Sequence, residues 1–190
     1  FDFSQEFLDE YFPHCVEMAR AFIQPKYQSA QSGRKALFAL DNLWDGIGGI
    51  VATDPSVKYL SGKVTIYSSS PEMSRKAMVY YLDMCFGDRK GLITSKNPET
   101  CTPEQAAFFK EMFTGEDYKE NYQILNNYVK SMGDVVPPLI HSYIGLSQTM
   151  KTFGTTFDPD FGDCYDTAMM ITISDIYQEK YERYIDSALQ

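Results

Sequence analysis

Cationic and small polar side chains gather in one stretch of the sequence, the segment 26–33 and the two residues after it. Lys26, Arg34 and Lys35 supply the charge, and the residues between them include glycine, serine and glutamine. An apolar run at residues 16–23 precedes this loop and a helical pattern follows it. A strand, a glycine-containing loop and a helix N-terminus together aim free backbone N–H groups at an anion. The stretch therefore predicts either a phosphate site or a plain structural turn, since it matches neither a P-loop nor a GxGxxG fingerprint.

Two charged residues, Glu17 and Arg20, interrupt the apolar run at residues 16–23. A carboxylate is unfavourable to bury without a partner and often has a shifted pKa at functional sites, so Glu17 is a candidate general base. The planar guanidinium of Arg20 suits a carboxylate or a hydroxyl group, or a structural tie. A direct ion pair between them is the alternative, although a separation of three points the side chains to opposite faces of a strand.

The elements around these residues alternate between strand and helix patterns. Residues 16–23 read as a strand that ends before Pro25, because proline cannot donate to a strand ladder. Residues 35–52 carry one apolar stripe at helical spacing, and residues 57–69 contain an alternating run typical of a strand. A helix follows at residues 70–86, with a serine predicted as its N-cap. The pattern predicts an α/β fold with neighbouring parallel strands.

The helix at residues 35–52 contains three further features. Gly46, Gly48 and Gly49 disfavour a helix interior, so they predict close approach to another backbone or to a ligand, or a frayed last turn. Asp41 and Asp45 are one helical turn apart and would repel each other unless they are solvated or share a cation such as an acceptor ammonium. Trp44, the only tryptophan, is predicted in the core.

The remaining sequence predicts a helical region and a second group of strands. Residues 88–135 are polar and charged, and they predict two helices that form an insertion, either a lid over a pocket or a surface elaboration. An acidic amphipathic helix is predicted at residues 1–12. The other predicted elements are a helix at 138–146, strands at 151–157 and 168–173, and a last helix capped by Ser174.

Composition excludes several function classes. A formal charge of −9 argues against a general nucleic-acid binder, which needs a basic face. No apolar run of 18 residues predicts a membrane span. The four cysteines lack metal-ligand spacing, which favours a reduced cytoplasmic chain and no metal site, and a lone His141 favours a structural role. The first residue is Phe1 rather than methionine, so we expect a fragment or a processed product.

Several segments, in a fixed order, resemble one enzyme family. They are Glu17-Met18-Ala19-Arg20, Leu43-Trp44-Asp45-Gly46-Ile47, Tyr59-Leu60-Ser61-Gly62, Val136-Pro137-Pro138-Leu139-Ile140 and Phe157-Asp158-Pro159-Asp160-Phe161-Gly162. With them the sequence resembles the acyl-carrier-protein-dependent N-acyltransferases of the GNAT superfamily. The nearest group is a bacterial one labelled hemolysin, which is similar to ornithine-lipid, glycine-lipid and N-acylglycine synthases and, more distantly, to acyl-homoserine-lactone synthases.

The resemblance implies a GNAT-like twisted mixed sheet with helices around it and an acyl-phosphopantetheine between two splayed central strands. No permanently bound cofactor is implied. The first part of the family fold would precede Phe1, so that residues 1–190 form the later part of one acyltransferase domain. Gln31 stands where acetyl-CoA-dependent members have a glycine, which weakens the case for acetyl-CoA. The implied sites are Glu17 and Arg20 for catalysis; Gln31, Ser32, Gly33, Arg34 and Lys35 for the donor; and Asp41, Trp44 and Asp45 for the acceptor.

Two functions of different classes follow. The first is transfer of a (3-hydroxy)acyl chain from acyl-carrier protein to the amine of a small amino acid, with glycine favoured over ornithine, in lipid biosynthesis. Its partners are the carrier protein and the amino acid, in the cytoplasm or at the membrane surface. The second is a non-catalytic or membrane-active lipid-binding protein, as the hemolysin label suggests. Lytic activity predicts a basic amphipathic helix, whereas the amphipathic segment 1–12 is acidic.

Overall fold

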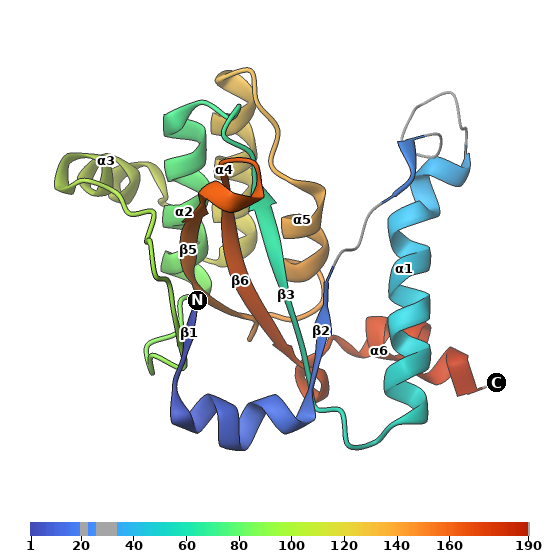
Figure 1. The fold of residues 1–190 in the computed structure, drawn as a ribbon. Coiled ribbons are helices and arrows are strands. Elements are labelled where there is room, and N and C mark those ends of the chain that lie inside the picture. The colour runs from blue at the N-terminus through green and yellow to red at the C-terminus, as the bar shows by residue number, and fades with distance from the viewer. Residues whose placement is uncertain (20–22, 26–33, 190) are drawn as a thin grey trace.

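The structure, a computed structural model, describes residues 1–19, 23–25 and 34–189, without the side chains of residues 34–41. Helices lie on a twisted mixed sheet, which confirms the predicted fold class and agrees with a GNAT-like arrangement (Figure 1). The elements are β1 (Asp2–Phe3), β2 (Cys15–Met18), α1 (Arg34–Thr53), β3 (Tyr59–Ile66), α2 (Glu72–Phe86), β4 (Ile93–Thr94), α3 (Pro103–Met112), α4 (Tyr118–Ser131), α5 (Pro138–Ile144), β5 (Lys151–Asp158), β6 (Cys164–Thr172) and α6 (Gln178–Tyr184).

The main sheet of the described residues has four strands in the order β2-β3-β6-β5. β2 runs parallel to β3, as the alternating strand and helix pattern predicts, and the other two pairs are antiparallel. The sequence predicts a first strand over residues 16–23, whereas β2 begins at Cys15 and ends at Met18. Residues 20–22 lie outside the described part of the chain, so the rest of that prediction has no structural counterpart here.

One face of the sheet packs on α2, α4 and α5 and forms the larger hydrophobic core (Figure 1). Alternate residues of β3 face this core because side chains alternate along a strand. The other face carries a smaller core at the N-terminal end of the chain. There Phe7, 3% exposed, packs with Leu92 and Ile93, and Phe3, Phe7 and Tyr11 stack in series.

The N-terminal segment therefore differs from the predicted helix at residues 1–12. It begins as strand β1, which pairs with β4 about ninety residues later, and its helical turn at Phe7–Tyr11 comes only after that pairing. The aromatic spacing of the prediction is right, but the pairing of Phe3 with Ile93 is long-range and could not be read from the local pattern.

The helical region 88–135 is also more deeply integrated than the predicted surface elaboration or lid. Phe109 of α3 and Leu125 and Val129 of α4 are completely buried in the larger core. Thr102 caps α3 through a capping box with Gln105. Two other predicted caps are wrong: Pro71, not Ser70, precedes α2, and Tyr177, not Ser174, precedes α6.

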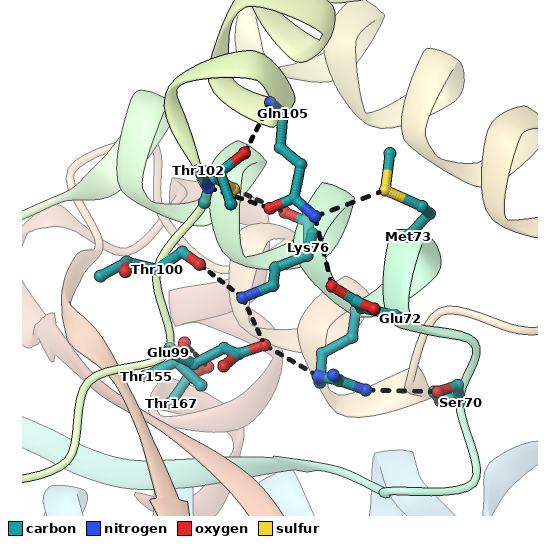
Figure 2. A network of polar contacts seen from close by, with 12 residues as sticks. Ser70, Glu72, Met73, Lys76, Glu99, Thr100, Thr102, Gln105, Thr155 and Thr167 are labelled. Atoms are coloured by element: carbon teal, nitrogen blue, oxygen red, sulfur yellow. Dashed lines mark hydrogen bonds and ion pairs between the residues drawn. The ribbon is translucent and has the colours of Figure 1, made fainter.

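Buried charges attach the segment before α3 to α2. Figure 2 shows Lys76 and Glu99 directed toward each other, and the Glu99 carboxylate accepts from Lys76 Nζ at 2.9 Å and from Arg75 Nε at 3.0 Å. The backbone N–H of Glu99 donates to the Thr155 carbonyl of β5. Arg75 also lies over the ring of Tyr165. Glu99 lies in the loop before α3. Through its carboxylate and its backbone N–H, it connects this loop to α2 and to the sheet.

The three glycines of α1 meet different environments. A Cβ on Gly48 would overlap the backbone carbonyl group of Tyr184, whereas a Cβ on Gly46 or Gly49 would have no described atom within 4 Å. The prediction of close approach to another backbone is therefore confirmed for Gly48 alone. This contact sets the distance between α1 and α6.

Replacing Gly48 with alanine is expected to lower the free energy of unfolding by about 1–3 kcal/mol, because two backbones must move apart. Urea titration measures the change. Gly46→Ala and Gly49→Ala are matched controls in the same helix, and open space with better helix propensity predicts neutral or stabilising effects up to about 1 kcal/mol. Equal effects at all three positions would contradict the packing role of Gly48.

Within the described residues, no helix has both the length and the apolar character needed to cross a membrane.

Candidate functional site

The candidate site lies where the pairing of β2 with β3 ends. The parallel ladder joins Cys15–Met18 to Tyr59–Gly62, and among the described residues the rest of β3, to Ile66, pairs with β6 but not with β2. Residues 23–25 stand well apart from this upper part of β3 (Figure 1). Backbone N–H and C=O groups along a strand that has lost its neighbour can bond an extended ligand. We call the end of this ladder, Met18 and Gly62, the β2–β3 junction.

Glu17 lies on one face of this junction and is the register partner of Ser61 on the neighbouring strand. Its side chain is exposed and takes part in no ion pair with a described residue. Burial, with a smaller contribution from the Glu17 charge, raises the pKa of the neighbouring Cys15 thiol. An exposed carboxylate beside a protonated thiol can accept a proton from an incoming ligand.

An ion pair between an exposed lysine and a buried aspartate lies further along the same face. Lys63 Nζ is 2.7 Å from Asp166 Oδ2, and Thr65 Oγ1 donates to Asp166 Oδ1 at 2.7 Å. Asp166 is 1% exposed, and its hydrogen bond raises the pKa of Lys63. Sequence reasoning missed this pair, because its members are 103 residues apart and only the β3–β6 register brings them together.

Tyr143 of α5 lies on the opposite face of the junction. A Cβ on Gly62 would overlap the Tyr143 hydroxyl and would lie 3.4 Å from the Met18 carbonyl oxygen. The Tyr143 ring packs edge-on against Trp44 of α1 at 5.6 Å between centroids. Sequence reasoning missed Tyr143, but a glycine inside the alternating pattern of β3 was a usable signal of close approach at this strand.

Burial raises the pKa of Tyr143 to about 12. In the unfolded chain the phenol ionises at about pH 10, so its contribution to stability is complete below pH 10 and is lost as the pH rises toward 12. Relative to Tyr143→Phe, the wild type is expected to lose about 1 kcal/mol of unfolding free energy at pH 11. Urea titrations at pH 8 to 11 measure this difference. Parallel pH dependences of the two proteins would contradict it.

The other predicted site residues are placed as follows. Trp44 is buried as predicted and contacts Tyr143, while Asp45 is exposed on α1. Arg34, Lys35 and Asp41 belong to α1, which begins at Arg34 directly after the predicted loop, but their side chains lie outside the described part of the structure. Arg20, Gln31, Ser32 and Gly33 lie outside the described residues altogether. The structure thus brings Glu17 and, through Tyr143, Trp44 to the β2–β3 junction.

The cysteines do not provide an activated nucleophile. Burial raises the pKa of all four thiols, that of Cys85 to about 11. They are therefore protonated at neutral pH, where a nucleophilic cysteine needs its thiolate. His141 stacks on Tyr122, which agrees with a structural role. The described residues include no cluster of three or more metal-ligating side chains.

Two curated bacterial proteins are similar to this chain over nearly its whole length. The protein from Phocaeicola vulgatus is 41% identical over 187 residues, 98% of this chain, and the one from Bacteroides thetaiotaomicron is 39% identical over 193 residues. Each is named glycine N(alpha)-acyltransferase. The chain spans 57% and 56% of these relatives. The similarity supports the acyltransferase resemblance that the sequence motifs indicate.

No protein-family model matches the chain, and no solved structure matches it.

Proposed function

We propose that the chain belongs to an N-acyltransferase that moves a (3-hydroxy)acyl chain from acyl-carrier protein to the amine of glycine. The observation that carries this proposal is the 41% identity, over 98% of the chain, to a protein named glycine N(alpha)-acyltransferase. The acyl-carrier donor, the GNAT superfamily and a lipid product come from the motif resemblance. Ornithine is the alternative acceptor. We place the reaction in the cytoplasm, with peripheral membrane contact if the product is a lipid.

The site supports direct transfer from the thioester to the amine. An acyl-enzyme route needs a nucleophile, and the four cysteines are kept protonated by burial. Direct attack needs a neutral amine and therefore a base near the thioester. Glu17 fits this role because its carboxylate is exposed at the β2–β3 junction, where an extended acyl-pantetheine can add alongside the part of β3 that has no β2 partner among the described residues.

The donor phosphate is assigned to the loop before α1. α1 begins at Arg34, so its N-terminus follows the polar loop directly and offers free N–H groups to an anion. We propose that Gln31, Ser32 and Gly33 contact the phosphate, with Arg34 and Lys35 adding charge. Arg20 binds the acceptor carboxylate or the acyl hydroxyl, and Asp41 and Asp45 orient the acceptor ammonium beside Trp44.

The test measures free thiol released from a 3-hydroxyacyl-carrier protein with and without glycine. The assay compares the protein at its full encoded length with residues 1–190 alone, and the Phocaeicola vulgatus relative serves as the reference. Glycine-dependent release with formation of N-acylglycine supports the proposal. Release by neither form across a panel of amino acids, with an active reference, would overturn it.

The membrane-active alternative gains no support from the N-terminal segment. Phe7 is buried against Leu92 and Ile93, so this aromatic side chain of the helical turn is covered by protein, whereas Leu8 of the same turn is 40% exposed. A lytic helix needs an exposed apolar face and a basic polar face. Asp9 and Glu10 make the polar side of this turn acidic.

A further inference from the structure

The Tyr143 hydroxyl occupies a distinctive position for a core side chain. It touches Gly62, the last residue of β3 that pairs with β2, so it stands where the two strands separate. The residue is 3% exposed, and its hydroxyl forms no hydrogen bond with another described residue. A phenol without a protein partner can donate a hydrogen bond to a ligand. By contrast, the buried Tyr81 hydroxyl donates to the Tyr118 carbonyl at 2.9 Å.

The two faces of the β2–β3 junction carry groups of different chemistry. Glu17 and Ser61 share one face, and because side chains alternate, Met18 and Gly62 belong to the other. Tyr143 reaches Gly62 from that second face. A thioester held between the separating strands therefore has a carboxylate on one side and a phenol on the other.

We propose that Tyr143 is a catalytic residue whose hydroxyl donates a hydrogen bond to the thioester carbonyl oxygen while the acceptor amine attacks from the Glu17 side. This inference rests on the proposed N-acyl transfer. As the carbonyl carbon becomes tetrahedral, its oxygen moves away from the attacking nitrogen and gains negative charge. A donor on the opposite face is thus aimed at the developing oxyanion.

The step balances without any further reactant. The neutral amine nitrogen forms the new C–N bond and passes one proton to the Glu17 carboxylate, while the carbonyl π pair moves to the oxygen that Tyr143 faces. When the carbonyl reforms, the C–S bond breaks and its electron pair leaves on the pantetheine sulfur, which takes the proton from Glu17 directly or through solvent. Tyr143 keeps its own proton throughout.

The surroundings of Tyr143 hold the phenol in place. α5 is a short helix whose Ile140 and Ile144 are buried beside Tyr143, and Trp44 fixes the ring from α1. Burial also keeps the hydroxyl protonated, since it raises the pKa to about 12. A fixed donor is more effective than a mobile one, because it needs no reorganisation as the oxygen becomes charged.

The first test is the steady-state kinetics of Tyr143→Phe. We expect kcat to fall about 100-fold with little change in the KM for the acyl donor, because the hydrogen bond strengthens only in the transition state. Tyr81→Phe is the matched control, a buried phenol far from the junction in the sequence, and its kcat should stay within about threefold of the wild type. A wild-type kcat for Tyr143→Phe would overturn the inference, whereas an inactive wild type would overturn the proposed function instead.

A second substrate distinguishes whether the Tyr143 hydroxyl donates to the carbonyl oxygen or to the leaving sulfur. An aryl thioester has a more acidic leaving thiol, which needs no proton donor to depart. If Tyr143 serves the carbonyl oxygen, the loss in Tyr143→Phe persists with this substrate. A loss that disappears with the aryl thioester would overturn the assignment and move the phenol to the sulfur.

A stability cycle tests the contact independently of activity. Gly62→Ala places a Cβ against the Tyr143 hydroxyl, so we expect the melting temperature to fall by about 3–9 °C. In the Tyr143→Phe background the nearest ring carbon is 3.5 Å from that Cβ, an ordinary contact, and the same substitution should have little effect. Equal losses in the two backgrounds would contradict the placement of the hydroxyl at the junction.

Discussion

Glu17→Gln is expected to lower kcat/KM for glycine by about 10²–10⁴-fold, the usual contribution of a positioned general base. The glutamine keeps the size and polarity of the side chain but cannot accept the proton that the amine must lose. Because Glu17 is exposed and has no ion-pair partner among the described residues, the substitution should leave the melting temperature within about 1 °C. The measurement is the rate of thiol release over a range of glycine concentrations.

The pH dependence gives this prediction a second readout. In the wild type the rate should rise as the base loses its proton, and that limb of the pH–rate profile should be absent in Glu17→Gln. Glu111→Gln on α3 is a matched exposed carboxylate outside the junction and should keep both the rate and the profile. A Glu17→Gln enzyme with the wild-type rate and profile would remove Glu17 from the proton transfer.

The elements that sequence reasoning predicted well are those whose burial is periodic. β3 reads as a strand because alternate residues from Leu60 to Ile66 face the larger core. α1 reads as a helix because Trp44 and Val51 are buried at helical spacing. In both cases the hydrophobic period is set by the geometry of a single element, so a local window of sequence contains the signal.

The parts of the candidate site that could not be predicted depend on pairing between distant segments. Lys63 is an ordinary exposed position of an alternating strand until the β6 register places Asp166 beside it. In the sequence, Tyr143 is one of several apolar residues of a short helix. Only the packing of α5 against β3 places its hydroxyl at Gly62. Only Glu17 has a local signal, a carboxylate in an apolar run, and that signal gives no indication of the phenol on the other face of the β2–β3 junction.

The same division applies to residues 88–135, which the sequence predicts to be a helical insertion. Their polar character indicated a surface insertion, and most of these side chains are indeed exposed. Three of the apolar ones, Phe109, Leu125 and Val129, are completely buried, and the segment before α3 bonds to β5 through backbone groups that no composition argument detects. Integration into the core therefore depends on a small number of residues and on one carboxylate, Glu99.

Glu99→Ala is accordingly expected to lower the free energy of unfolding by about 3–5 kcal/mol, because it leaves two buried cations without their shared partner. The side chains of Arg75 and Lys76 are each 11% exposed and that of Glu99 is 14% exposed. Asp83→Ala is the matched control, since the exposed Arg89–Asp83 pair should contribute no more than about 1 kcal/mol. Urea titration of both variants measures the contrast, and similar losses would show that the buried network is no stronger than a surface pair.

The loss at Glu99 should arise from unpaired charge rather than from missing volume, and a double variant separates the two causes. Lys76→Met in the Glu99→Ala background removes one of the two cations while it keeps an apolar stem of similar length in α2. If uncompensated charge dominates, the double variant should be more stable than Glu99→Ala alone, even though it carries one more substitution. If lost packing dominates, the second substitution should lower stability further. Recovery would establish that Glu99 holds α2, the loop before α3 and β5 together as a shared counter-charge.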